Sequence, residues 1–178
     1  MTFLCERHTR FLSRRPELKA LCRRELLVQG YTALENDNHK AAIHYFGACF
    51  ELTDLCLGSA PLPAARNLYG CLDQLMLSGH LLAESLGRLG HRELEYHYLL
   101  AVHHRLTKWA NRLGLSRVHK LHRNLEISLL MLKRYTERHG YLATYRVCRE
   151  ETEKLIHPLG QCRDSCPDAL QSAARRGA

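Results

Sequence analysis

Cysteine and histidine residues near the two ends of the chain have spacings that could hold a metal ion. Cys5 and His8 are separated by two residues, and Cys162 and Cys166 by three. Thiolate sulfur and imidazole nitrogen are the usual protein ligands of zinc, so these four residues would complete a site if the two ends met. Structural zinc sites usually show both ligand pairs at tight spacing. We therefore favour two unrelated tails and predict no metal site.

Histidines in the middle of the chain could take part in acid–base or metal chemistry. His97, His103 and His104 follow Glu93 and Glu95 in one segment, and such groups can transfer protons or bind a metal. The carboxylates precede the histidines without an HExxH arrangement, and no glycine-rich phosphate loop, nucleophile elbow or CxxC motif occurs in the sequence. We predict that the protein is not an enzyme and has no cofactor.

Helices are expected to position these residues, because apolar side chains recur at spacings of three, four and seven along most of the chain. Turn-forming residues interrupt the pattern at 36–38, 58–63, 90, 114–116 and 140. Glycines within the third helix, Gly70, Gly79 and Gly87, suggest close helix contacts or a kink, since glycine is a poor helix former. The predicted helices span residues 16–35, 39–57, 64–89, 92–113, 117–138 and 141–156.

The predicted organisation has three parts. Residues 1–15 form a basic lead-in, residues 16–157 a helical-repeat domain, and residues 158–178 a tail with a short helix that ends near residue 175. Pro158 and Gly160 should end the sixth helix, because proline removes a backbone hydrogen bond and glycine is common after a helix. The fold class is therefore all-α.

Spacing within residues 30–50 resembles a tetratricopeptide repeat. Gly30 stands twelve residues before Ala42, which is followed by Phe46 at plus four and Cys49 at plus seven. A weaker return places His91, Leu94, Tyr98 and Ala101 fifty-two residues after the first motif, and Gly140, Ala143 and Val147 form a third. The resemblance implies antiparallel helical hairpins stacked as a short right-handed array, in which small residues let two helices approach and the aromatic fills the gap to the next pair.

The same resemblance implies a protein-interaction role. Tetratricopeptide arrays bind an extended or helical peptide on a concave surface, which is lined mainly by the first helix of each pair. In this chain those helices are the first, third and fifth. The exposed groups expected on this surface are Arg24, Gln29, Tyr31, Arg66, Asn67, Tyr69, Arg117, Lys120, Arg123 and Asn124.

Composition limits the class of protein and of partner. The chain has 178 residues, 46% of them hydrophobic, and a formal net charge of +8. It has no apolar run long enough to span a bilayer and no leader-like apolar segment near its start, so we predict a cytoplasmic protein without membrane insertion. The eight cysteines are spread along a core-rich chain, which is typical of reduced thiols.

Three functions remain from the sequence. The first is an interaction adaptor or regulatory scaffold whose basic surface binds a peptide or helix of another protein, with an acidic segment as the expected ligand. The alternatives are a nucleic-acid-binding helical module, favoured by the net positive charge, and a metal-binding protein that uses its Cys and His residues. A homo-oligomer is compatible with each of them.

Overall fold

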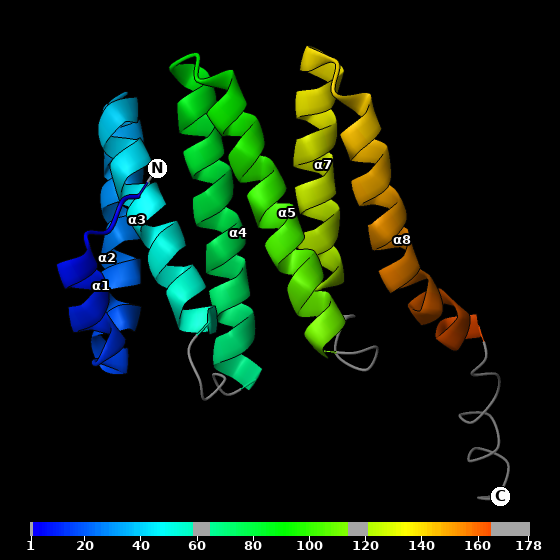
Figure 1. The fold of residues 1–178 in the computed structure, drawn as a ribbon, viewed down its shortest axis with the longest axis horizontal. Helices are drawn as coiled ribbons and strands as arrows, with labels where there is room; N and C mark the ends of the chain where they lie inside the picture. The colour runs from blue at the N-terminus through cyan, green and yellow to red at the C-terminus, as the bar shows by residue number, and fades with distance from the viewer. Residues whose placement is uncertain (1, 59–64, 114–120, 165–178) are drawn as a thin grey trace, which may run out of the picture.

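The computed structural model describes residues 2–58, 65–113 and 121–164, and in these ranges every regular element is a helix. The helices are α1 (Glu6–Ser13), α2 (Pro16–Glu35), α3 (His39–Gly58), α4 (Ala65–Arg88), α5 (Arg92–Leu113), α7 (His122–His139) and α8 (Leu142–Asp164). Consecutive helices from α2 onward run antiparallel and stand side by side in a row (Figure 1). The predicted all-α array of stacked hairpins is confirmed for these residues.

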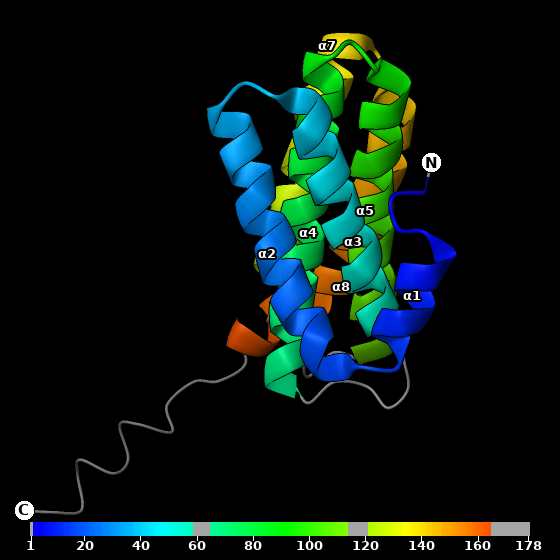
Figure 2. The same ribbon diagram turned by 90° about the vertical axis from the view of Figure 1, so that its left-hand side faces the viewer.

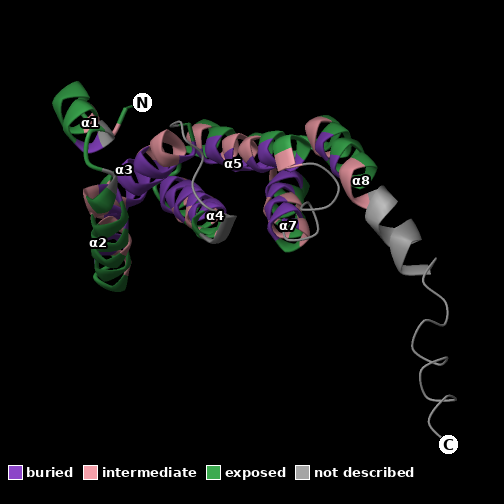
Figure 3. Ribbon diagram, turned by 90° about the horizontal axis from the view of Figure 1, so that it is seen from below, coloured by how far each residue is buried: buried purple, intermediate pink, exposed green. Residues whose placement is uncertain are grey.

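Two layers of helices make up the row. Helices α2, α4 and α7 form one layer and α3, α5 and α8 the other, and most of the buried residues lie where the layers meet (Figure 3). From α2 to α8 the most extensive packing is between described helices that follow one another in the chain, and α4 and α5 also contact α7 and α8 respectively. The first helix of every predicted pair thus lies in one layer.

Asparagine and glycine residues form the tight turns of the array. Asn38 accepts a hydrogen bond from the Ala41 amide at 3.1 Å and so caps α3. Asp37, Gly90 and Gly140 all have positive φ angles, of 54°, 80° and 87°, which is the left-handed conformation that asparagine, aspartate and above all glycine adopt. These residues let the chain reverse within two or three positions.

Residues of the first repeat-like motif pack as the pattern predicts. Ala42, Phe46 and Cys49 are fully buried on α3. The Phe46 ring lies against the backbone of Gly30 so closely that a Cβ atom there would overlap it. The third motif differs, because Val147 on the last described helix is 55% exposed. Membership of the tetratricopeptide family stays a prediction.

Glycines of α4 serve different purposes. A Cβ atom on Gly79 would overlap the Val102 side chain, and one on Gly87 would overlap the Glu95 carboxylate, whereas Gly70 has no atom within 4 Å of that position. The prediction of close helix contacts is therefore confirmed at Gly79 and Gly87 and is wrong at Gly70.

Two predictions about the ends of the chain are wrong. The lead-in of residues 1–15 contains α1, and α8 continues through Pro158 and Gly160 to Asp164. A helix that is already formed over four turns can pass a proline at the cost of one backbone hydrogen bond, because nucleation is the expensive step. The predicted short helix near residue 175 lies outside the described residues.

The cysteines whose side chains are described form no disulfide. Cys49, Cys71 and Cys148 are buried, and all six cysteines whose side chains are described are free. Burial raises the pKa of the Cys49 thiol to about 11. None of the described helices is both long and apolar enough to cross a bilayer.

Candidate partner-binding surfaces

The predicted surface residues on α2 are exposed. Arg24, Gln29 and Tyr31 lie on the helix that begins the array, and Gln29 donates a hydrogen bond to Glu25 at 2.8 Å. Tyr31 is 41% exposed, and its ring packs edge-on against Phe46 with 5.7 Å between the ring centroids. These three side chains are available to a partner.

The predicted residues on the other two helices of this layer are less uniform. Asn67 and Arg123 are exposed and Tyr69 is half-buried. The expectation that Asn124 is exposed is wrong, because its side chain is buried and donates a hydrogen bond to Asp73 at 2.7 Å, joining α7 to α4. The Arg66 side chain and residues Arg117 and Lys120 lie outside what the structure describes.

A large apolar groove lies at the α2 end of the array. It has a volume of about 1020 Å³, and α1 and α2 stand on opposite sides of α3, which forms its floor (Figure 2). Leu21 and Val28 lie about two turns apart on α2. Their side chains are 64% and 51% exposed. The groove is lined by Phe3, Leu4, Cys5, His8, Leu12, Leu21, Cys22, Arg24, Glu25, Leu26, Val28, His44, Ala48 and Leu52.

The far wall of the apolar groove is held by the residues before α1. The Phe3 and Leu4 amides donate three hydrogen bonds of 2.8–3.0 Å to the carboxylate of Glu51 on α3. The Phe3 ring fills the space over Gly47, where a Cβ atom would overlap it, and lies 6.3 Å from the Tyr98 ring. α1 itself has few contacts with α2, so the space between them stays open.

The segment around the apolar groove is positively charged. Residues 2–28 contain seven arginine and lysine side chains and three glutamates. Lys19 and Arg23 are buried, which leaves five exposed cations against three exposed glutamates. Arg24, Glu25 and the two histidines His8 and His44 lie on the groove itself. An apolar trough in a segment with an excess of exposed cations fits the apolar side of a helix whose edges are acidic.

A second cavity, the arginine cleft, is lined by residues of α4, α5 and α7. It has a volume of about 880 Å³, and Arg88, Arg92, Arg134 and Arg138 contribute to its lining. Its inner wall includes Leu99 and Met131, together with the buried Glu95. The two turns beside it, α4–α5 and α7–α8, both lie along the upper edge of the row in Figure 1.

Glu95 is the buried anion of the arginine cleft, and Glu84 and Glu137 also belong to its lining. The Glu95 side chain is 10% exposed and lies 3.5 Å from Arg138, and its carboxylate occupies the space that a side chain at Gly87 would need. Burial raises the pKa of the Glu95 carboxyl, while the positive charges of Arg138 and His139 partly offset this effect. The carboxylate therefore reduces the positive potential at the floor of the cleft.

The three histidines of the predicted cluster, His97, His103 and His104, lie in different environments on α5. His97 and His104 are exposed, whereas His103 is fully buried. His103 contacts Ser128 of α7 through Nδ1 at 2.8 Å and Thr152 of α8 through Nε2 at 3.3 Å. This arrangement joins three helices and leaves no open position for a substrate.

Cys5 and His8 form a pair at the mouth of the apolar groove. Cys5 Sγ lies 3.0 Å from His8 Nδ1, and both residues are exposed. The other two residues of the hypothetical zinc site are not placed, since the Cys162 side chain and Cys166 are outside the described part of the chain. Within that part, no group of three or more His, Cys, Asp or Glu side chains is arranged to hold a metal ion.

Comparison with known proteins identifies no relative. No protein-family model, curated protein or solved structure matches the chain. Sequence reasoning identified Arg24 but missed the apolar wall of α2 and all four arginines of the arginine cleft. Those arginines do carry a signal in the sequence, because Arg88 and Arg92, like Arg134 and Arg138, are four residues apart and lie next to a predicted turn.

Proposed function

We propose that this protein is an interaction adaptor that binds an amphipathic helix of a partner protein in the apolar groove. The observation that carries the proposal is the exposed apolar wall of α2, where Leu21 and Val28 face a groove of about 1020 Å³. Covering such side chains releases about 25 cal/mol for each Å² of apolar surface removed from water. That term supplies the driving force for association.

Charge around the apolar groove defines the partner further. With five exposed cationic side chains against three exposed glutamates in residues 2–28, a helix with glutamate or aspartate beside its apolar stripe is favoured over one with basic edges. Rim charges of this kind mainly raise the association rate and exclude wrong partners. The ligand is therefore a helix with leucine-like residues at spacings of three and four and acidic residues flanking them.

Substitution of the α2 wall tests the proposal. The variant L21E/V28E places two carboxylates where the partner's apolar side chains would lie, and both positions are exposed, so the fold should be preserved. The matched control is L77E/L130E, which changes two exposed leucines, 38% and 45% exposed, on α4 and α7. Proteins from the native host that bind the wild type and the control, and are lost with L21E/V28E, are the partners.

The retained partners then provide the decisive measurement. Their binding segment is mapped by crosslinking from a photoreactive residue at position 28, and a synthetic peptide of that segment is titrated by calorimetry. We expect a peptide that becomes helical on binding, and whose affinity falls at least tenfold when its acidic residues are changed to lysine. Equal loss of partners with both double variants, or a bound segment that lacks an apolar stripe, would contradict the proposal.

A further inference from the structure

The arginine cleft contains two guanidinium groups that have no ionic partner among the described residues. Arg88 is paired with Glu84 at 3.6 Å and Arg138 with Glu95 at 3.5 Å. Neither Arg92 on α5 nor Arg134 on α7 has a carboxylate within 4.0 Å in the described ranges. Two exposed cations from different helices thus line one cavity without a direct ion pair, although Glu84, Glu95 and Glu137 are part of the same lining.

The surroundings of these two cations strengthen their interaction with an anion. Leu99, Met131 and Ala83 are part of the lining, so the cavity is bordered by groups that polarise less than water. Coulomb attraction rises as the effective dielectric constant falls, and near a protein surface a pair at about 4 Å interacts roughly four times more strongly than in bulk water. An anion seated between α5 and α7 would gain from this effect.

Guanidinium chemistry selects the class of anion. Arginine presents several N–H donors in a planar fork, which matches the oxygens of a phosphate or carboxylate group. A phosphate monoester offers three terminal oxygens and close to two negative charges at neutral pH, so it can accept from both guanidinium groups at once. A single carboxylate has two oxygens and one charge, and would leave one arginine poorly satisfied.

We propose that the arginine cleft is a binding site for a phosphate monoester, held by Arg92 and Arg134. The cleft, at about 880 Å³, is much larger than a phosphate ion, so it has room for the organic group that the ester carries. That group belongs either to a phosphorylated small molecule or to a phosphorylated side chain of a partner. This site is independent of the apolar groove, with which it shares no lining residue.

Glu95 gives the site a second testable property. Its carboxylate lies on the same lining as the two arginines and repels a bound phosphate, and the charged groups that face it are Arg138 and His139 from α7, Glu84 from α4 and Arg92 from its own helix. Removal of its charge by Glu95→Gln should therefore strengthen binding severalfold, whereas a merely structural role of Glu95 would not change the affinity in that direction.

Calorimetric titration of the full-length protein tests the site. Glycerol 3-phosphate represents the small molecule, and a short alanine-based peptide with one phosphoserine represents the side chain. Glycerol and the unphosphorylated peptide are the ligand controls. We expect saturable binding of one phosphorylated probe per chain, and the tighter of the two probes identifies the source of the phosphate.

Two double variants separate a specific site from general charge attraction. R92Q/R134Q should weaken binding at least tenfold, while K108Q/R146Q removes the same charge from exposed positions on α5 and α8 outside the cleft lining and should change it less than twofold. Equal weakening by the two variants, or no saturable binding of either probe to the wild type, would overturn the proposal. L21E/V28E should bind the probes normally, so failure here is distinct from failure at the apolar groove.

Discussion

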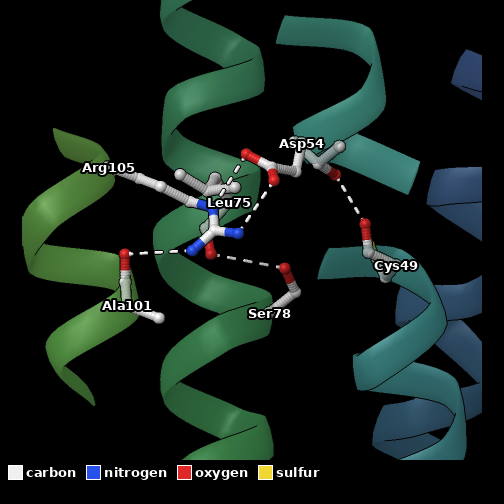
Figure 4. Close-up of polar contacts among 7 residues, drawn as sticks. Cys49, Asp54, Leu75, Ser78, Ala101 and Arg105 are labelled. Carbon is white, nitrogen blue, oxygen red and sulfur yellow. Dashed lines mark hydrogen bonds and ion pairs between the residues drawn. The ribbon is translucent and has the colours of Figure 1, made fainter. Parts of the chain in front are cut away.

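The guanidinium group of Arg105 forms a forked ion pair with the carboxylate of Asp54. Nε lies 2.8 Å from Oδ1, and Nη2 lies 2.9 Å from Oδ2, so α5 is joined to α3 (Figure 4). The same guanidinium stacks over the Phe50 ring at 5.0 Å from its centroid. Asp54 and Arg105 belong to successive hairpins, so this pair ties one repeat-like unit to the next.

Replacement of Arg105 by lysine should cost about 0.5–1 kcal/mol of unfolding free energy. Lysine keeps the charge but offers no planar fork, and both side chains are more than a third exposed, which limits the value of the pair. Urea unfolding of Arg105→Lys, Asp54→Asn and the double variant gives the part of the coupling energy that depends on the guanidinium group. Additive effects of the two single changes would show that arginine pairs with Asp54 no more strongly than lysine does.

Glycines 79 and 70 on α4 should respond to alanine in opposite directions. A Cβ atom at Gly79 would overlap Val102 and lie 2.9 Å from the Phe50 ring, whereas Gly70 has open space around that position. Gly79→Ala should therefore destabilise the protein by about 1–3 kcal/mol through overpacking, and Gly70→Ala should stabilise it by about 0.5–1 kcal/mol through helix propensity. Thermal unfolding of the two variants decides the matter, and stabilisation by both would refute the close contact.

Stability should fall as the pH drops below about 6.5. Burial lowers the pKa of His103 and of His80 to about 4, while histidine in an unfolded chain titrates near 6.5. Between these values the unfolded chain binds protons that the folded protein does not, so each histidine removes up to about 1.4 kcal/mol of unfolding free energy per pH unit. The loss is complete near pH 4, where the folded state takes up the same protons.

Single histidine substitutions measure how much each buried histidine contributes to this loss of unfolding free energy. Urea unfolding at several pH values between 7.5 and 5 gives the slope of the unfolding free energy against pH. This slope should correspond to nearly two protons in the wild type and nearly one in either His103→Gln or His80→Gln. The exposed His97 on the same helix is the control, because it is not among the groups that shift the pKa of His103 or His80, and His97→Gln should keep the wild-type slope. The carboxyl of Glu95, whose pKa is raised, adds an opposite contribution at the acid end that cancels when variants are compared. A slope that none of the variants changes would contradict the assignment.

Helix boundaries could be predicted where local chemistry decides them. Pro16 at the first turn, the capping Asn38 and the positive-φ glycines Gly90 and Gly140 act within a few residues of themselves. They therefore carry the same signal in the sequence as in the structure. The predicted ranges 16–35 and 92–113 agree with α2 and α5.

The features that the sequence did not predict depend on packing between residues that are far apart in the chain. α1 has no side-chain cap at Cys5, and its position depends on Glu51, which is 47 or 48 residues away in the chain. The arginine cleft brings together Arg92 and Arg134, which are 42 residues apart in the chain, through the packing of α5 against α7. Asn124 was misjudged for the same reason, because its partner Asp73 lies on another helix. No periodicity within one helix encodes these pairings.

The hydrogen bonds between Glu51 and the residues before α1 give a final prediction. Glu51→Ala removes the acceptor of three backbone hydrogen bonds from Phe3 and Leu4, and hydrogen bonds to a charged group contribute about 1.5–3 kcal/mol. Since α1 has few other contacts with the array, amide hydrogen exchange in residues 6–13 should become at least tenfold faster, while α4 to α8 stay protected.

Glu6→Ala is the control, because among the described residues Glu6 pairs with the exposed Arg10 on its own helix. Equal acceleration throughout the chain would mean that Glu51 supports the whole fold, and unchanged exchange would mean that α1 is held by other contacts. If α1 detaches as expected, the apolar groove loses one wall, and the affinity for the partner helix should fall with it.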